Sequence, residues 1–206
     1  MTSIIYNVKQ RNDTKEIGMK VSREQAAQNR ERILDTAAQL FRERGFEGIG
    51  VADLMKEAGL THGGFYGHFS SKEDLIAQAS ARALKRSLAL WGKLAERTPD
   101  DPLAAIASLY LTKRHRDDPG AGCVLAALGP DVSRQGPAVR RTVTDYVRSA
   151  CELLAKLVPG KSKAARRQKA ISTYATLVGA MVIARAVDDR ALSQEILDAG
   201  LASLKA

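Results

Sequence analysis

The apolar residues of this chain recur with the period of an α-helix almost from end to end. In the first clear stretch, apolar positions at i, i+1, i+4, i+7 and i+8 share one helix face: Ile33, Leu34, Ala37, Leu40 and Phe41. Aromatic residues make up only 5% of the chain, and no segment alternates β-branched with polar residues. We therefore predict an all-α fold of about nine helices.

Prolines, glycines and capping residues divide the periodic stretches. The expected helices cover residues 24–45, 51–58, 62–68, 72–97, 99–116, 123–133, 137–157, 163–187 and 191–204. Residues 1–18 show neither a sustained period nor a cap, whereas Ser22 and Gln25 have capping-box spacing. We expect residues 1–21 to form a mobile N-terminal extension; the alternative is a helical arm.

Composition narrows the class of protein. The chain of 206 residues suits one domain, or two small ones that share a core. Its 2 Cys and 3 His lack zinc spacing, and no apolar run approaches the ~18 residues of a membrane span. We expect a cytoplasmic protein with reduced thiols and neither metal nor cofactor. The net charge of +9 favours polyanionic partners, but the excess is spread along the chain.

Residues 51–69 read VADLMKEAGLTHGGFYGHF, two short helices joined by a glycine-containing turn. This is the helix-turn-helix arrangement, whose second helix enters the major groove of DNA. The first helix needs an apolar inner face, which Val51, Leu54, Met55 and Ala58 supply. Gly59 permits a positive φ in the turn. Two adjacent short core helices are the alternative interpretation.

The stretch ERILDTAAQLFRERGFEGIGVADLMKEAGLTHGGFYGHFSSKEDL resembles the tetracycline-repressor (TetR) family of bacterial transcription regulators. The resemblance covers about residues 29–79 and implies an N-terminal three-helix DNA-binding domain, joined by a long helix to a C-terminal helical bundle. It implies DNA contacts from the second helix of the motif and the start of the next one. The implied DNA-binding residues are Thr61, His62, Gly63, Gly64, Tyr66, His68 and Lys72.

Three positions depart from the family pattern. Gly50 stands where Ser or Thr often caps the second helix, and Gly64 and Gly67 stand where larger residues are common. Glycine inside a helix costs on the order of 1 kcal/mol, and it removes a side chain that could read a base. The resemblance therefore supports the phosphate-binding roles of Tyr66, His68 and Lys72 more strongly than any base-reading role.

The resemblance also implies the roles of the two domains. We expect DNA binding in residues 22–80, and ligand binding and dimerisation in residues 81–206. Small residues at Thr176, Gly179, Ala180 and Ala184 favour close helix packing, either in a homodimer or within one chain. A dimer is expected because two half-sites of a palindromic operator require two recognition helices.

A ligand pocket is expected between the helices of the C-terminal bundle. The candidate region contains Trp91, Tyr110, Cys123, Leu128 and Tyr146, and ordinary core is the alternative for each. Cys123 opens a short helix after a Pro-Gly-Ala-Gly loop, which resembles family members that sense electrophiles or oxidants through a cysteine. A buried cysteine that acts as a small apolar residue is the alternative.

The three histidines and one basic cluster have interpretations that do not all involve DNA. His62 contacts DNA or is a solvated turn residue, and His68 contacts phosphate or packs against backbone. His115 lies at an expected helix end, where a cation complements the helix dipole. The basic cluster over 161–169 is expected to be a solvated face.

Together these features predict a DNA-binding transcriptional regulator, a repressor that a small molecule releases from its operator, with an electrophile as one candidate for that molecule. The alternatives are an architectural DNA-binding protein without a ligand and an enzyme. No phosphate loop, metal-ligand spacing or nucleophile constellation supports an enzyme.

Overall fold

The computed structural model describes the backbone of residues 9–205 and the side chains of residues 23–204. These residues form nine α-helices and two short 3-10 helices, with no strand among them, so the all-α prediction is confirmed. The elements are α1 (Lys9–Arg44), α2 (Val51–Glu57), η1 (His62–Gly67), α3 (Lys72–Arg97), α4 (Pro102–Tyr110), α5 (Lys113–Asp117), η2 (Pro119–Ala121), α6 (Val124–Ser133), α7 (Pro137–Leu157), α8 (Lys163–Ala186) and α9 (Arg190–Lys205).

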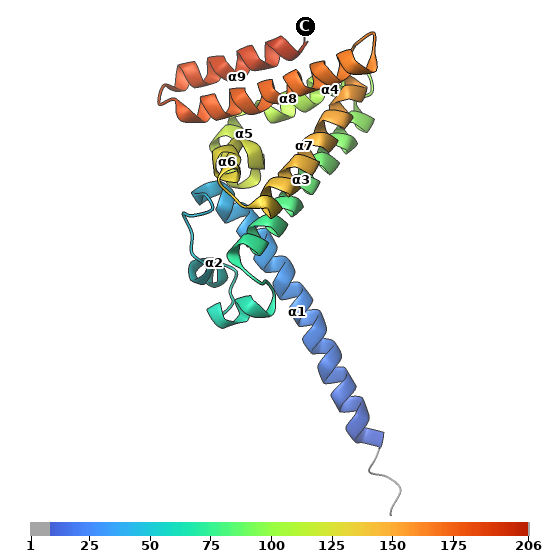
Figure 1. Ribbon diagram of the computed structural model, residues 1–206, viewed down its shortest axis with the longest axis vertical. Coiled ribbons are helices and arrows are strands. Elements are labelled where there is room, and N and C mark those ends of the chain that lie inside the picture. The colour runs from blue at the N-terminus through green and yellow to red at the C-terminus, as the bar shows by residue number, and fades with distance from the viewer. Residues whose placement is uncertain (1–8, 206) are drawn as a thin grey trace, which may run out of the picture.

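Two groups of helices are joined by α3 (Figure 1). The second half of α1 packs with α2 and η1 at one end, and α8 and α9 lie side by side at the other. Helix α3 starts beside η1 and runs along α7 into the second group. The short elements α5, η2 and α6 lie at the junction, where η2 and α6 also contact α1.

Aromatic side chains fill the core of the small N-terminal group. Phe41 and Phe46 meet edge to face at 5.5 Å between ring centroids, and Phe65 stacks on Phe69 at 5.8 Å. All four rings are buried. The expected turn at Gly59 is present, with a φ of 69°, and Gly45 after the end of α1 also has a positive φ of 80°.

Three local predictions differ from the structure. Helix α1 begins at Lys9 rather than near Glu24, and its backbone passes through Ser22, so the capping-box spacing there starts no helix. Residues 1–8 of the expected extension lie outside the described residues, and its mobility stays a prediction. The segment 62–68 is a 3-10 helix, because three glycines in six residues have little α-helical propensity. Thr61 makes no side-chain cap there.

The helix expected over 99–116 is divided in two. Helix α4 ends at Tyr110, Leu111 turns into the core, and the Thr112 hydroxyl oxygen accepts a hydrogen bond of 3.1 Å from the His115 backbone N–H. That bond caps a new helix, α5, and sends the chain in another direction. The break has a functional consequence, because it places His115 and the following loop beside the bundle.

No helix in the described part of the chain is long and apolar enough to cross a membrane.

Candidate functional site

The helix-turn-helix presents its apolar side inward. Leu54, Met55 and Ala58 of α2 are buried, and Phe65 and Phe69 anchor the segment that contains η1. The Leu60 backbone N–H donates 2.9 Å to the Met55 carbonyl, which closes the turn at Gly59. This packing fixes the orientation of η1 relative to the rest of the domain.

The opposite side of η1 faces solvent. Thr61, His62, Gly63, Gly64 and Tyr66 are exposed, and 70% of Tyr66 is accessible. The His62 and Tyr66 rings lie edge to face with centroids 6.3 Å apart, so they form one aromatic pair on the exposed side of η1. A Cβ placed on Gly63 would meet nothing within 4 Å, which leaves this surface open to close approach by a large ligand.

The remaining two predicted DNA-binding residues border this surface. His68 is half-buried beside Phe69, with ring centroids 6.4 Å apart. Lys72 opens α3, and its Nζ lies 3.2 Å from the Glu47 carboxylate, which is 82% exposed. Glu47 escaped the sequence analysis because it is 25 residues distant. The Glu47 carboxylate holds the Lys72 ammonium group at the surface, where a DNA phosphate could take the place of that carboxylate.

Helix α3 is tied to α1 by a charged cluster. Arg82 of α3 makes a bidentate contact with Asp35 of α1, at 2.6 Å and 3.0 Å, and Arg86 adds a second contact at 2.8 Å. Burial alone would raise the pKa of Asp35, but the hydrogen bonds and charges of both arginines outweigh it and lower that pKa. The carboxylate therefore stays ionised, and α1 and α3 are held as one body.

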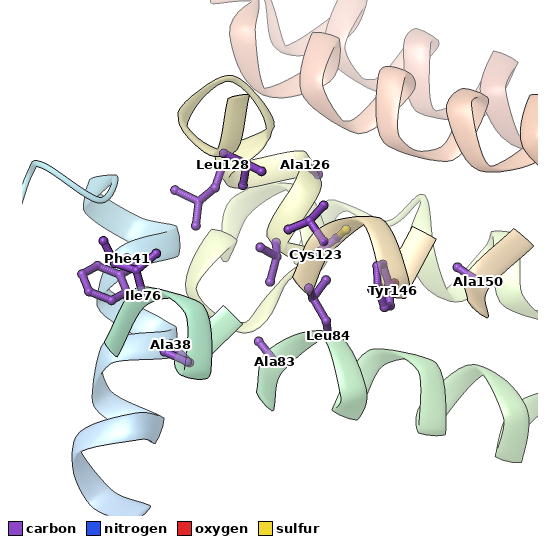
Figure 2. Close-up of a cluster of buried hydrophobic side chains, with 14 of the residues drawn as sticks. Ala38, Phe41, Ile76, Ala83, Leu84, Cys123, Ala126, Leu128, Tyr146 and Ala150 are labelled. Atoms are coloured by element: carbon purple, nitrogen blue, oxygen red, sulfur yellow. The ribbon is translucent and has the colours of Figure 1, made fainter. Parts of the chain in front are cut away.

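A cavity of about 410 Å³ lies in the C-terminal bundle. Four of the five residues of the predicted pocket region line it: Trp91, Tyr110, Cys123 and Tyr146. Leu128 is a correction, because it lies with Phe41 and Ala79 where α1, α3 and α6 meet. Figure 2 shows the resulting separation, with Leu128 on the side of Phe41 and Cys123 close to Tyr146.

His115 forms part of the cavity wall and bridges two backbone segments. Its Nδ1 lies 2.7 Å from the Tyr110 carbonyl oxygen, and its Nε2 accepts a 2.9 Å hydrogen bond from the Cys123 backbone N–H. Because Nε2 accepts, the single ring proton sits on Nδ1 and is donated to Tyr110. The sequence pattern predicts only a helix-end role for His115, because the break at Leu111 is not visible in it.

Two arginines hold the loop that leads from His115 to Cys123. Arg42 of α1 donates from Nε to the Gly120 carbonyl at 2.8 Å, and Arg185 of α8 donates to the carbonyls of Arg116, at 3.1 Å, and His115. A Cβ on Gly120 would lie 2.3 Å from the Glu43 carboxylate, so a larger residue here would require the Glu43 side chain to move. The loop thus connects the cavity to the helix that carries the helix-turn-helix.

Cys123 lies at the N-cap of α6 and is 5% exposed. The second cysteine, Cys151, is buried in α7 and does not line the cavity. The two thiols therefore differ in their access to a small molecule.

The His115 bridge predicts a pH dependence of stability. Burial lowers the pKa of His115 below 6.5, the Arg185 charge lowers it further, and the Tyr110 carbonyl and Asp118 oppose this shift. A lowered folded pKa means that the stabilisation is complete above 6.5 and is lost as the pH falls through the folded value.

We expect the melting temperature to fall more between pH 7.5 and 5.5 in the native chain than in His115→Gln, whose neutral amide does not titrate. Parallel pH profiles of the two proteins would contradict this role of His115.

Comparisons with known proteins agree with this geometry. A family model described as bacterial regulatory proteins, tetR family, matches residues 33–79. The HTH-type transcriptional regulator AcrR of Shigella flexneri is 28% identical over 90 residues, 44% of this chain and 42% of that protein. The HTH-type transcriptional repressor KstR2 of Mycolicibacterium smegmatis is 29% identical over 87 residues, 42% of each chain. The matched stretch thus spans less than half the length of these curated relatives.

Solved structures extend the similarity to most of the chain. E. coli NemR in its reduced form has a TM-score of 0.73 and 26% identity, over 86% of this chain and 95% of that one. A TetR-family transcriptional regulator from Agrobacterium tumefaciens has a TM-score of 0.72 at 23% identity, over 87% and 98%. The motif, the exposed recognition segment and these matches agree: residues 33–79 form a DNA-binding domain of the bacterial tetR-family type, and the chain as a whole is similar to TetR-family transcriptional regulators.

Proposed function

We propose that this protein is a cytoplasmic, ligand-responsive repressor that binds a palindromic DNA operator as a homodimer. The observation that carries the proposal is the exposed face of η1, held on a rigid domain whose own helix α1 contacts the wall of the effector cavity. The relatives with matching sequence are described as transcriptional regulators, which supports a regulator over an enzyme.

The DNA-facing roles follow from the chemistry of each side chain. Thr61, His62, Gly63 and Gly64 lie at the N-terminal end of η1, the end that approaches base edges in a helix-turn-helix complex. Tyr66, His68 and Lys72 carry hydroxyl, imidazole and ammonium donors suited to phosphate oxygens. The glycines bring backbone near the DNA and add little base discrimination of their own.

The dimer would form through α8 and α9. Exposed apolar side chains lie on α8, namely Ile171, Val182 and Ile183, and Leu192 of α9 adds to them. The small residues predicted on α8 fall into two groups, those packed within the chain and one with open space beside it. Ala184 is buried within the chain and a Cβ on Gly200 would lie 3.0 Å from Ala180, whereas a Cβ on Gly179 would meet nothing within 4 Å. Gly179 is therefore free for a partner subunit.

Two connections couple the cavity to DNA in this proposal. Helix α3 begins at Lys72 and passes the cavity at Ser87, Leu90 and Trp91. The loop before Cys123 is bonded to Arg42 of α1, so a shift of that loop displaces α1 directly. A ligand that favours one position of these elements would shift the separation of the two recognition segments.

Cys123 is the residue through which an electrophilic inducer would act. It lines the cavity and is joined through His115 and the loop to Arg42. A ligand-independent architectural role is the alternative function, and footprinting of the DNA flanking the gene separates the two. A protected palindrome that is released after thiol modification supports the repressor, and protection without any palindrome contradicts it.

Lys72→Ala is expected to weaken binding to operator and random duplex alike, because it removes a phosphate contact. The slope of log affinity against log salt should fall by about one. Tyr66→Phe should lose about tenfold in affinity, since it removes one hydrogen bond to a charged oxygen. Fluorescence anisotropy at several salt concentrations measures both effects.

Glu47→Ala is the matched control, because it frees the Lys72 ammonium without removing it. We expect its DNA affinity to equal or exceed that of the native protein. An unchanged salt slope in Lys72→Ala would show that this lysine does not touch DNA.

Val182→Glu is expected to raise the dimer dissociation constant at least about a hundredfold, because it would bury an unpaired carboxylate in the subunit interface. Sedimentation velocity measures the change. Thr144→Glu alters the charge equally at an exposed site of α7 and should leave the dimer intact. Dimers of equal strength in both variants would place the interface elsewhere.

Alkylation by iodoacetamide is expected to release the native protein from DNA and to leave Cys123→Ser bound. Gel shift before and after treatment measures this, with Cys151→Ser as the matched control that should respond like the native chain. If native protein and Cys123→Ser respond equally, or neither responds, Cys123 is not the sensor.

A further inference from the structure

The cavity wall beside Cys123 carries hydrogen-bond donors that the protein itself does not use. Tyr110 and Tyr146 line the cavity, and each is about nineteen-twentieths buried, with 5% and 6% exposed. Neither hydroxyl has a hydrogen-bond partner within the described chain. Buried polar groups are nearly always paired, so two unpaired hydroxyls in one cavity wall point to a ligand that supplies the partner.

The state of these phenols makes them donors. Burial raises the pKa of Tyr110 and of Tyr146, and the neighbouring Cys123 thiol raises both further. Both hydroxyls therefore keep their protons at neutral pH. The missing partner on the ligand is a hydrogen-bond acceptor such as a carbonyl oxygen.

The charges around the cavity limit the charge that its ligand can carry. Arg114 lines the cavity, and the Arg185 guanidinium would lie 3.0 Å from a Cβ on Gly122, next to Cys123. Asp118 is the one carboxylate in the described wall, and it accepts a bond from the Ala121 N–H. This balance disfavours a cationic ligand and favours a neutral molecule whose oxygen gains negative charge.

Aromatic rings set the shape of the ligand. Trp91 meets Tyr110 edge to face, with centroids 5.9 Å apart, and the Tyr110 ring meets His115 at 4.5 Å. The cavity of about 410 Å³ is of a size that takes a small ring compound. A flat, conjugated molecule fits these walls better than a bulky one.

We propose that the effector is an α,β-unsaturated aldehyde or ketone, held by hydrogen bonds from Tyr110 and Tyr146 to its carbonyl oxygen while the Cys123 thiol adds to its β-carbon. The inference rests on the proposed role of Cys123. In the addition, the sulfur–carbon bond forms, and the π electrons of the double bond move onto the carbonyl oxygen. The thiol proton ends on the α-carbon, so the product is a saturated thioether and no further reactant is consumed.

The tyrosines are specificity-determining in this scheme. The oxygen becomes an enolate during the addition, and donors already in place stabilise that charge as an oxyanion hole does. An alkylating agent that reacts by simple displacement develops no such charge, and its rate should be indifferent to the two hydroxyls.

The experiment compares cyclohex-2-en-1-one with benzyl bromide on the full chain without DNA. Mass spectrometry of the Cys123 peptide gives the rate of modification, with the Cys151 peptide as internal reference. We expect Tyr110→Phe with Tyr146→Phe to slow cyclohexenone addition at Cys123 at least about tenfold, and to change the benzyl bromide rate less than about twofold.

Thr173→Val is the matched control, because it removes a buried hydroxyl of α8 that does not line the cavity. It should react like the native protein with both reagents, and equal melting temperatures show that all variants fold. Equal slowing by Thr173→Val, parallel slowing of both reagents, or no cyclohexenone adduct at Cys123 in the native chain would overturn the inference.

The readout separates this inference from the regulatory function. An adduct that forms with the expected tyrosine dependence but leaves DNA bound would overturn the proposed release mechanism and support the recognition of the carbonyl. If iodoacetamide releases DNA but the rate of cyclohexenone addition does not depend on the two tyrosines, the release mechanism is supported and the recognition of the carbonyl is overturned.

Discussion

The short loop between α5 and α6 depends on hydrogen bonds from two arginines that form no salt bridge with a carboxylate among the described side chains. Arg42 and Arg185 donate to backbone carbonyls on either side of it, and His115 ties its end to Tyr110. Removing either guanidinium would leave buried carbonyls unpaired, at a cost of about 1–3 kcal/mol for each. Because one arginine belongs to α1 and the other to α8, this loop joins the DNA-binding group to the bundle.

In the proposed function, that connection is the route by which the cavity and the DNA-binding group affect each other. The Arg82–Asp35 contact keeps α1 and α3 together, so a displacement of either helix moves the whole helix-turn-helix. The recognition segment itself is held by Phe65 and Phe69 and needs no rearrangement of its own. The part of the structure that can change is thus the position of the N-terminal group on the bundle. A ligand that binds one such position more tightly than another would favour that position.

Much of this structure could be predicted from sequence, and the exceptions have a common physical cause. Helix periods and the turn at Gly59 are local signals, and each is confirmed. The salt bridge of Lys72 to Glu47 and the bridge of His115 to Cys123 join residues brought together by folding. The break at Leu111 hid the second of these, because Thr112 acts as a cap only once the core has captured Leu111. Leu128 was misplaced for the same reason, since periodicity shows that a face is buried and not which helix covers it.

The histidine bridge also constrains what Cys123 can do. His115 accepts from the Cys123 backbone N–H, so its Nε2 lone pair is already engaged and is not available as a base for the thiol. Any activation of the sulfur must therefore come from the surroundings, which are the α6 N-terminus and the positive charge of Arg185. The same occupied lone pair keeps the imidazole neutral. Selectivity among electrophiles then depends on the groups in the cavity wall that stabilise one particular product.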